Sequence, residues 1–214
     1  MQRVPSLRGW HLADVEVLFG VVAAAFGLTV TFAGGVKYLG RLIDDGNLDT
    51  LLIQPKPVLV HALGMRSQPS GLGDLLSGVL LIALSGQVSW RAVPIVAGAV
   101  IAGALVFIAC GIMFFSLAFW IGKADTLAQQ LWDLLITFAV YPEPLFGGML
   151  RLLLFTALPA GFVGYVPARV VRAPSAANVA LLAAGAVVYI AAAVRMFEHG
   201  LRRYASGSRF STFG

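Results

Sequence analysis

Charged residues are scarce in this sequence. Only 12% of its 214 residues are Asp, Glu, Lys or Arg, whereas about a quarter are charged in an ordinary soluble domain. Hydrophobic residues account for 59%, and the mean hydropathy is +0.87. So few charges do not suffice to cover a surface that faces water, and the composition therefore predicts a protein whose main solvent is lipid.

The sequence also lacks the motifs of common catalytic and metal sites. Its one cysteine, Cys110, lies in an apolar run, so an intramolecular disulfide is excluded. No GxxxxGKS/T, HExxH or GxSxG motif occurs, and His11, His61 and His199 are far apart. We therefore expect no catalytic residue, no metal site and no cofactor in this chain.

The net charge of +5 does not indicate a nucleic acid partner. Basic residues lie mostly at the ends of apolar runs, and no basic stripe with interleaved aromatic residues is present. Such positions suit contacts with membrane lipid headgroups. Arg3 and Arg8 precede an apolar run that is too long for a secretory signal peptide, so we expect this run to be a membrane span.

Long uncharged runs predict an all-α polytopic membrane protein with about five transmembrane helices. About 20 apolar residues cross a bilayer core as a helix, and neither residues 17–36 nor residues 94–121 contain a charge. The apolar stretch 58–66 is too short to span and is expected at the surface. The predicted spans, within a single transmembrane domain covering 1–214, are 10–36, 72–88, 94–121, 127–140 and 176–194.

Small side chains recur every four residues in the first predicted span. Ala23, Gly27, Thr31 and Gly35 share one helical face, and such strips let two helix backbones approach closely. The strip predicts tight packing against another helix. A chance spacing in a sequence rich in Gly and Ala explains the pattern equally well, so both interpretations stay open here.

The fourth predicted span is interrupted. After 127–140 comes Tyr141-Pro142-Glu143-Pro144, whose prolines break a helix. We interpret the following residues as a re-entrant or surface-lying helical hairpin at 142–166, whose freed backbone groups find protein or water. A second interpretation makes 127–147 and 150–166 two separate crossings, which would place the C-terminus on the other side of the membrane.

One acid lies inside the fourth predicted span. Asp133 is six residues into an apolar run, and a carboxylate within the membrane is a functional candidate. Asp133 is therefore a candidate for a transport path, although it could equally face a helix partner or a wet cavity. A path with few charges favours a lipid-like or amphipathic substrate.

The polar segment 37–57 separates the first two predicted spans. Gly46 lies in its middle and interrupts a short amphipathic pattern that resumes behind it. We interpret the segment as a cytoplasmic docking loop. The apolar positions before the break are Leu39, Leu42 and Ile43; those behind it are Leu48, Leu51 and Leu52, and Pro55 and Pro57 end the pattern.

The distribution of basic residues predicts an orientation. With five crossings and a cytoplasmic C-terminus, nine bases lie inside and six outside, which agrees with the positive-inside rule. Met1 is then outside, which suggests that a span is missing from the front. The inside set is Lys37, Arg41, Lys56, Arg66, Lys123, Arg195, Arg202, Arg203 and Arg209; the outside set is Arg3, Arg8, Arg91, Arg151, Arg169 and Arg172.

Three spaced motifs resemble those of a known family. Ile43-Asp44-Asp45-Gly46-Asn47-Leu48-Asp49, followed by Leu51-Leu52 and Pro55, resembles the I-x-x-G-x-L-D-x-L-L-x-x-P signature of ABC-2 family transporter permeases. Tyr141-Pro142, with Arg151 and Pro159 behind it, resembles the broken fifth helix of the six-span group. The stretch from Arg195-Met196-Phe197 to Ser206 resembles its closing segment. The sequence departs from the family at Gln54, where a basic residue is usual, and in lacking the usual first span.

The resemblance implies a permease subunit that pairs with a second permease chain, identical or different, and with a cytoplasmic ATPase subunit that binds ATP. The loop would be the coupling helix that docks on the ATPase. Ile43, Leu48 and Leu52 would pack against the protein itself, and Gly46 would provide the break. Asp44, Asp45 and Asp49 would face the partner, although Asp49 is as well explained as the cap of a helix at 50–53.

The alternative to a permease is a non-transporting membrane scaffold, including a degenerate permease without its first span. A lipid-modifying enzyme is least favoured, because no cluster of His, Asp or Cys lies at a predicted membrane face. Binding of an ATPase through 37–57 would separate the permease from the scaffold.

Overall fold

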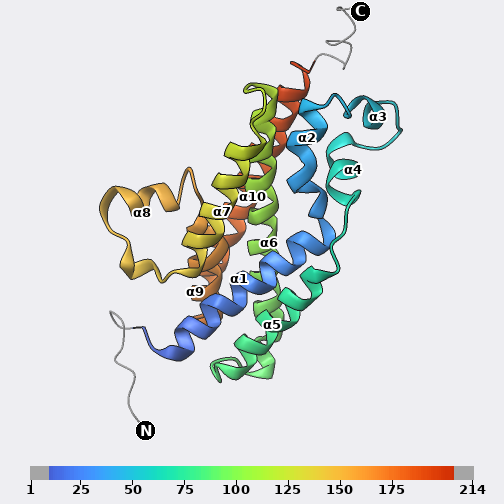
Figure 1. Cartoon of the computed structure of the whole chain (residues 1–214). Helices are drawn as coiled ribbons and strands as arrows, with labels where there is room; N and C mark the ends of the chain where they lie inside the picture. Colours follow the sequence, from blue (N-terminus) through green and yellow to red (C-terminus); the bar gives the residue numbers. More distant parts are fainter. Residues whose placement is uncertain (1–9, 205–214) are drawn as a thin grey trace, which may run out of the picture.

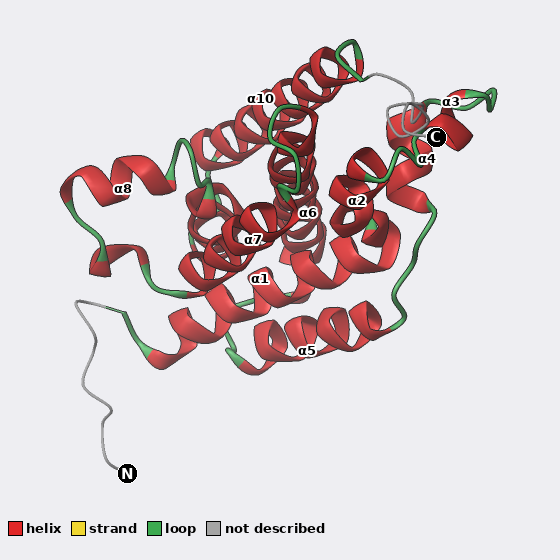
Figure 2. Cartoon of the chain, turned by 45° about the horizontal axis from the view of Figure 1, so that its top comes forward, coloured by secondary structure: helices red, strands yellow, loops and turns green. Residues whose placement is uncertain are grey.

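The computed structural model describes residues 10–204, so Arg3, Arg8, Ser206 and Arg209 lie outside the described part. The described residues form helices and no strand (Figure 2), which confirms the all-α class. The long helices are α1 (Leu12–Phe32), α5 (Ser70–Leu84), α6 (Val93–Phe115), α7 (Asp125–Val140) and α10 (Ala176–Leu201).

Three helical stretches in the described part are long and apolar enough to cross a membrane. They are Leu12–Phe32, Ala176–Leu201 and Trp90–Phe119, the last of which joins α6 to the short helices η2 (Trp90–Ala92) and η3 (Ser116–Phe119). Helix α5 is apolar but has only 15 residues. The protein is embedded in a membrane, and the number of crossings stays a prediction.

Helices α1, α6 and α10 run in one direction, and α5 runs back alongside α1 (Figure 1). We call the end of the bundle where α1, α6 and α10 finish the loop end. It carries η1 (Gly34–Tyr38), α2 (Leu39–Asp44), α3 (Asp49–Leu52) and α4 (Val58–Gly64). The predicted surface stretch 58–66 thus forms the short helix α4.

The fourth predicted span is made of two helical pieces. Helix α7 starts at the loop end and stops at Val140, and η5 (Gly161–Tyr165, a π-helix) continues into α9 (Val166–Arg172). Arg172 reaches Asp14 at the start of α1 through a 2.8 Å ion pair, so α9 finishes at the end opposite the loop end. The helical segment that begins with η5 therefore continues beyond residue 166. Pro167 does not end it, because it lies in the first turn of α9, where a missing N–H is tolerated.

Residues 141–160 form a limb between these two pieces. It contains η4 (Glu143–Leu145) and α8 (Gly148–Leu154), and α8 stands away from the bundle in both views (Figures 1 and 2). Tyr165 of η5 donates its hydroxyl proton to the Phe138 carbonyl at 2.6 Å. This bond holds α7 and the η5–α9 piece together, and we call these two pieces the return helix. The limb projects sideways from it.

Small residues bring α1 and α5 into close contact. A methyl group on Gly27 would stand 2.5 Å from the Gly71 carbonyl oxygen, and one on Gly78 would stand 2.5 Å from the Gly20 carbonyl oxygen. The predicted role of Gly27 in tight helix packing is therefore confirmed. Gly20 also contacts α5 but lies outside the predicted strip. It is seven residues before Gly27, which is one step of three plus one of four, so both glycines lie on the same helical face.

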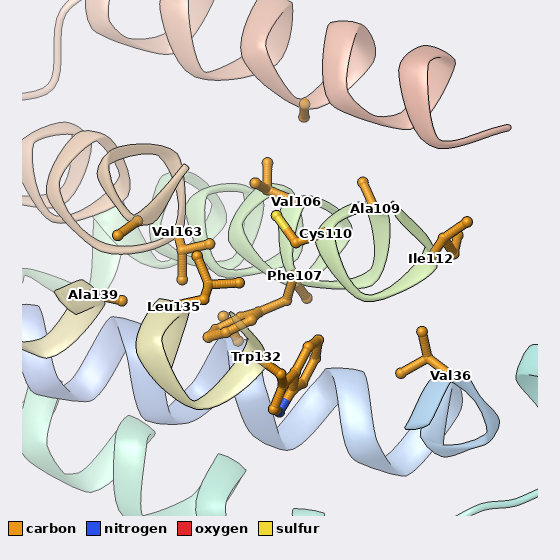
Figure 3. Packing of buried hydrophobic residues seen from close by; sticks show 14 of the residues in the cluster. Val36, Val106, Phe107, Ala109, Cys110, Ile112, Trp132, Leu135, Ala139 and Val163 are labelled. Carbon is orange, nitrogen blue, oxygen red and sulfur yellow. The ribbon is translucent and has the colours of Figure 1, made fainter. Parts of the chain in front are cut away.

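The core is aromatic at the level where α1, α6 and α7 meet. Trp132 of α7 is fully buried, and its ring centroid lies 5.7 Å from that of Phe107 (Figure 3). Phe26 of α1 and Phe115 of α6 complete the group, with ring centroids 6.4 Å from Trp132. This cluster fixes α7 against the two long spans.

We expect Gly78→Ala to destabilise the protein and Gly73→Ala to leave it unchanged. Both positions are on α5, but a methyl group at Gly73 meets nothing within 4 Å, whereas at Gly78 it meets backbone. Overpacking of this kind costs about 1–3 kcal/mol. Thermal unfolding of the purified protein in detergent measures the difference, and equal unfolding temperatures for the two variants would contradict the packing described here.

Candidate functional site

The segment 37–57 folds as two short helices around a turn. Helix α2 ends before Gly46, which has φ of 74°, a conformation that favours glycine. The Gly46 N–H donates to the Ile43 carbonyl at 3.3 Å, and the Leu48 N–H donates to the Leu42 carbonyl at 3.1 Å. These bonds terminate α2 and place Leu48 at the start of α3.

One side of the loop packs on the bundle and the other is exposed. Ile43, Leu48 and Leu51 are buried. Leu52 is 43% exposed, so the predicted packing of Leu52 against the protein itself is wrong. The reason is that α3 is a single turn, so only one of its two adjacent leucines faces inward. Its neighbour Ile53 is 85% exposed, and Pro55 is exposed as well.

The three acids of the loop have different surroundings. Asp45 is exposed, whereas Asp44 accepts a hydrogen bond from the Lys123 N–H at 3.3 Å. Burial raises the pKa of Asp44; the Lys123 N–H lowers it, and the negative charges of Asp125 and Asp45 add to the rise. Asp49 is half-buried in the first turn of α3, whose N-cap residue is Leu48. The prediction that Asp49 caps a helix at 50–53 is therefore wrong, because α3 already begins at Asp49 and its N-cap residue is Leu48.

Helix α2 is fastened to the turn that joins α6 to α7. Arg41 Nε lies 3.3 Å from Asp125 Oδ2, next to the Asp44–Lys123 hydrogen bond. Lys123 itself has φ of 59°, which is uncommon for a residue with a side chain. A methyl group on Gly40 would stand 3.2 Å from Asp125 Oδ1, so α2 lies close to the start of α7.

Helix α3 lies next to the end of α10. Burial raises the pKa of Tyr204, and the negative charge of Asp49 adds to the rise. The Tyr204 ring packs edge-on against Phe119 at 6.3 Å between centroids, and Phe119 also contacts Phe197 of α10 at 5.6 Å. The loop is thus connected to the ends of α6, α7 and α10.

A recess of about 230 Å³ opens between α2 and the end of α4. Arg66 stacks on Tyr38, with the guanidinium carbon 3.8 Å from the ring centroid, and Arg41 lies on the same ring at 5.4 Å. The lining is therefore polar and mixed in charge. It consists of Tyr38, Arg41, Leu42, Asp45, Asn47, Met65 and Arg66.

The predicted helix break lies at the base of the limb. Helix α7 ends at Val140, Tyr141 is extended, and Pro142 is buried. Glu143, whose side chain is 14% exposed, binds Arg151 of α8 at 2.6 Å and Arg169 of α9 at 2.8 Å. Pro144 lies in η4. One carboxylate therefore holds the limb to the return helix.

Asp133 lies on the exposed side of α7, away from the other predicted site residues. Its Oδ1 accepts a hydrogen bond from Gln129 Nε2 at 2.9 Å, one helical turn earlier. Thr137, one turn further on, donates its hydroxyl proton to the Asp133 carbonyl at 2.8 Å. These residues form a polar strip on α7, and the role of Asp133 in transport stays a prediction.

Sequence reasoning missed the residues that fix the loop to the bundle. The sequence analysis uses Arg41 and Lys123 only as bases that set the orientation. It places Tyr204 only within the closing segment and assigns no role to Tyr38. Each acts through a partner more than 25 positions away in the sequence. The amphipathic pattern around Gly46 located the loop, but it gave no information on which residues outside the loop hold it.

The fold defines a helical membrane protein with an exposed, anchored loop at one end. The chain matches the family model described as "ABC-2 family transporter protein" over residues 1–208, and it belongs to that family. Comparisons with curated proteins and with solved structures returned no match. The chain is accordingly a membrane subunit of the ABC-transporter class, whose members work with an ATPase subunit.

We expect Asp44→Asn to change how stability depends on pH. Because the pKa of Asp44 is raised in the folded state above its usual value of 3.8, the native protein binds the proton more tightly than the unfolded chain. Its stability therefore falls as the pH rises from 3.8 through the folded-state pKa. Asn keeps the oxygen that accepts the Lys123 N–H and does not ionise. Thermal unfolding between about pH 3.5 and pH 7 should show the wild type losing stability relative to Asp44→Asn, and parallel curves would refute this assignment.

We expect Glu143→Gln to loosen the limb. The change removes the charge that binds both Arg151 and Arg169, at a cost of about 1 kcal/mol because both guanidinium groups are largely exposed. Limited proteolysis in detergent should cut the limb faster. Arg151→Gln leaves the pair with Arg169 and should give a smaller increase. Identical cleavage of wild type and Glu143→Gln would show that other contacts hold the limb.

Proposed function

We propose that the chain is the permease subunit of an ABC exporter. In this proposal the loop 37–57 docks on a cytoplasmic ATPase subunit, which binds the ATP. A second permease chain, identical or different, completes the transport path. The loop end and the C-terminal end of α10 are then cytoplasmic, since they lie at the same end of the bundle (Figure 1).

The observation that carries the proposal is the two-sided character of the loop. Its inner side is fixed by the Arg41–Asp125 ion pair, by the Asp44–Lys123 hydrogen bond and by the buried Leu48. Its outer side presents an almost fully exposed Ile53. A rigid body attached to the ends of several spans transmits the movement of whatever binds its outer side.

The exposed side has the features of a docking surface for a protein. Leu52 and Ile53 form a small exposed apolar surface. The recess beside Arg41 and Asp45 contains charges of both signs. Large apolar side chains that are exposed to water mark interaction sites. A partner with an apolar pocket and polar residues around it fits this combination.

Charge supports the cytoplasmic placement of the loop end. The bases that lie toward the loop end outnumber those at the opposite end of the described bundle, as the positive-inside rule requires. The first set is Lys37, Arg41, Lys56, Arg66, Lys123, Arg195, Arg202 and Arg203, and the second is Arg91, Arg169 and Arg172.

The test is co-purification of the protein with an ABC ATPase subunit, sought first among the products of neighbouring genes. We expect Ile53→Ser to weaken its co-purification about tenfold, because an exposed anchor of an interface typically contributes 1–2 kcal/mol or more. The fold should be unaffected, since Ile53 contacts little of its own chain. Leu12→Ser makes a similar change at the opposite end, where Leu12 is 63% exposed, and should leave capture unchanged.

A second variant of the loop separates docking from coupling. Gly46→Ala strains the turn by about 1–2 kcal/mol, because a side chain disfavours its positive φ. In reconstituted complexes, ATP hydrolysis should continue while transport falls. Normal capture by Ile53→Ser together with normal transport by Gly46→Ala would exclude the loop as the coupling element.

A further inference from the structure

Lys37 directs its ammonium group into the bundle rather than toward the loop end. It lies in η1, five residues after α1 finishes at Phe32. Its Nζ is nevertheless 5.5 Å from the ring centroid of Phe26 and 5.6 Å from that of Trp132. Phe26 precedes the end of α1 by six residues, which is about 9 Å along a helix. The charge is therefore level with the spans.

This orientation is the reverse of the usual one. A lysine near the end of a span normally extends its ammonium group outward to the headgroups, because a charge within the bilayer is costly. Contact with the faces of two aromatic rings offsets only part of this cost. An ionisable group held inside a membrane bundle indicates a functional contact.

Two hydrogen-bond donors without acceptors meet at the same ring. In the described part of the chain no carboxylate lies within ion-pair distance of Lys37, and no acceptor binds its ammonium group. The indole N–H of Trp132 is buried and also has no partner. The neighbouring Asp133 is exposed and bound to Gln129. Trp132 is fully buried, so only the half-buried Lys37 can reach an acceptor that belongs to another molecule.

We propose that the ammonium group of Lys37 binds an oxyanion, a phosphate or carboxylate group, of a membrane amphiphile, beside the ring of Trp132. Lys37 is half-buried and reachable, whereas the ring of Trp132 is buried against Phe107 (Figure 3). Phe115 lies on the same ring, with 6.4 Å between the centroids. Charge-assisted hydrogen bonds to an oxyanion are strong where water is scarce. The assignment of this amphiphile as the transported substrate class rests on the proposed function; its binding does not.

Fluorescence of Trp132 reports directly on this site. With Trp10, Trp90 and Trp120 replaced by Phe, Trp132 is the only tryptophan left in the chain. The full-length protein in neutral maltoside detergent is titrated with lysophosphatidylglycerol, which is anionic, or with lysophosphatidylcholine of the same chain length, which has no net charge. We expect the emission to shift with the anionic probe, which should bind about tenfold more tightly than the zwitterionic one.

Variants at position 37 test whether the preference for the anionic lipid depends on the positive charge of Lys37. Lys37→Met keeps the length of the side chain and should abolish the preference for the anionic probe, whereas Lys37→Arg should retain it. Lys56→Met removes a lysine that is exposed on the loop and serves as the matched control. Circular dichroism and thermal unfolding check that each variant is folded.

The outcomes are distinct. Equal affinities of the wild type for both lipids, or an unchanged preference in Lys37→Met, would overturn the proposal. A shift of the same size with inorganic phosphate alone would support the oxyanion site and identify a soluble anion as its source. Because no ATPase is present, the result does not depend on docking at the loop, and failure of ATPase capture would leave this binding intact.

Discussion

Close backbone contact between helices is the constraint on which this structure depends. Lipid is as apolar as the helix surfaces, so the spans gain little from burying hydrophobic side chains and associate instead by fitting tightly together. Gly20 and Gly27 of α1 meet Gly78 and Gly71 of α5 for this reason. Helix α6 and the aromatic cluster around Trp132 pack against α1 as well.

The attachment of the loop at the loop end supports its proposed role in docking. A short amphipathic helix on a flexible tether would absorb a push from a partner. Here α2 is held at the turn between α6 and α7, and α3 rests beside the end of α10. Movement imposed on the loop therefore reaches several spans together. The limb at 141–160 is attached elsewhere, through the ion pairs of Glu143 and through the Tyr189 hydroxyl, which donates to the Phe155 carbonyl at 2.9 Å.

The polar groups within the bundle fall into two kinds. Asp14, Arg172 and Gln87 satisfy one another at the end opposite the loop end, as the 2.8 Å distances from Asp14 show, and they have structural roles. Lys37 and Trp132 have no such partners in the described residues. Of these groups, the ammonium group of Lys37 is half-buried beside Phe26 of α1 and Trp132 of α7, which is why the proposed binding site lies there.

The sequence by itself determined the class of the protein, because scarcity of charge and long apolar runs leave a helical membrane protein as the main solution. It also located the turn at Gly46 and the end of α7 near Tyr141, since glycine and proline act locally. Only the tertiary structure decided that Leu52 is exposed, that α9 continues the direction of α7, and that Lys37 points inward. These three features depend on contacts between residues that are distant in sequence. Local sequence patterns do not specify which distant side chains become neighbours.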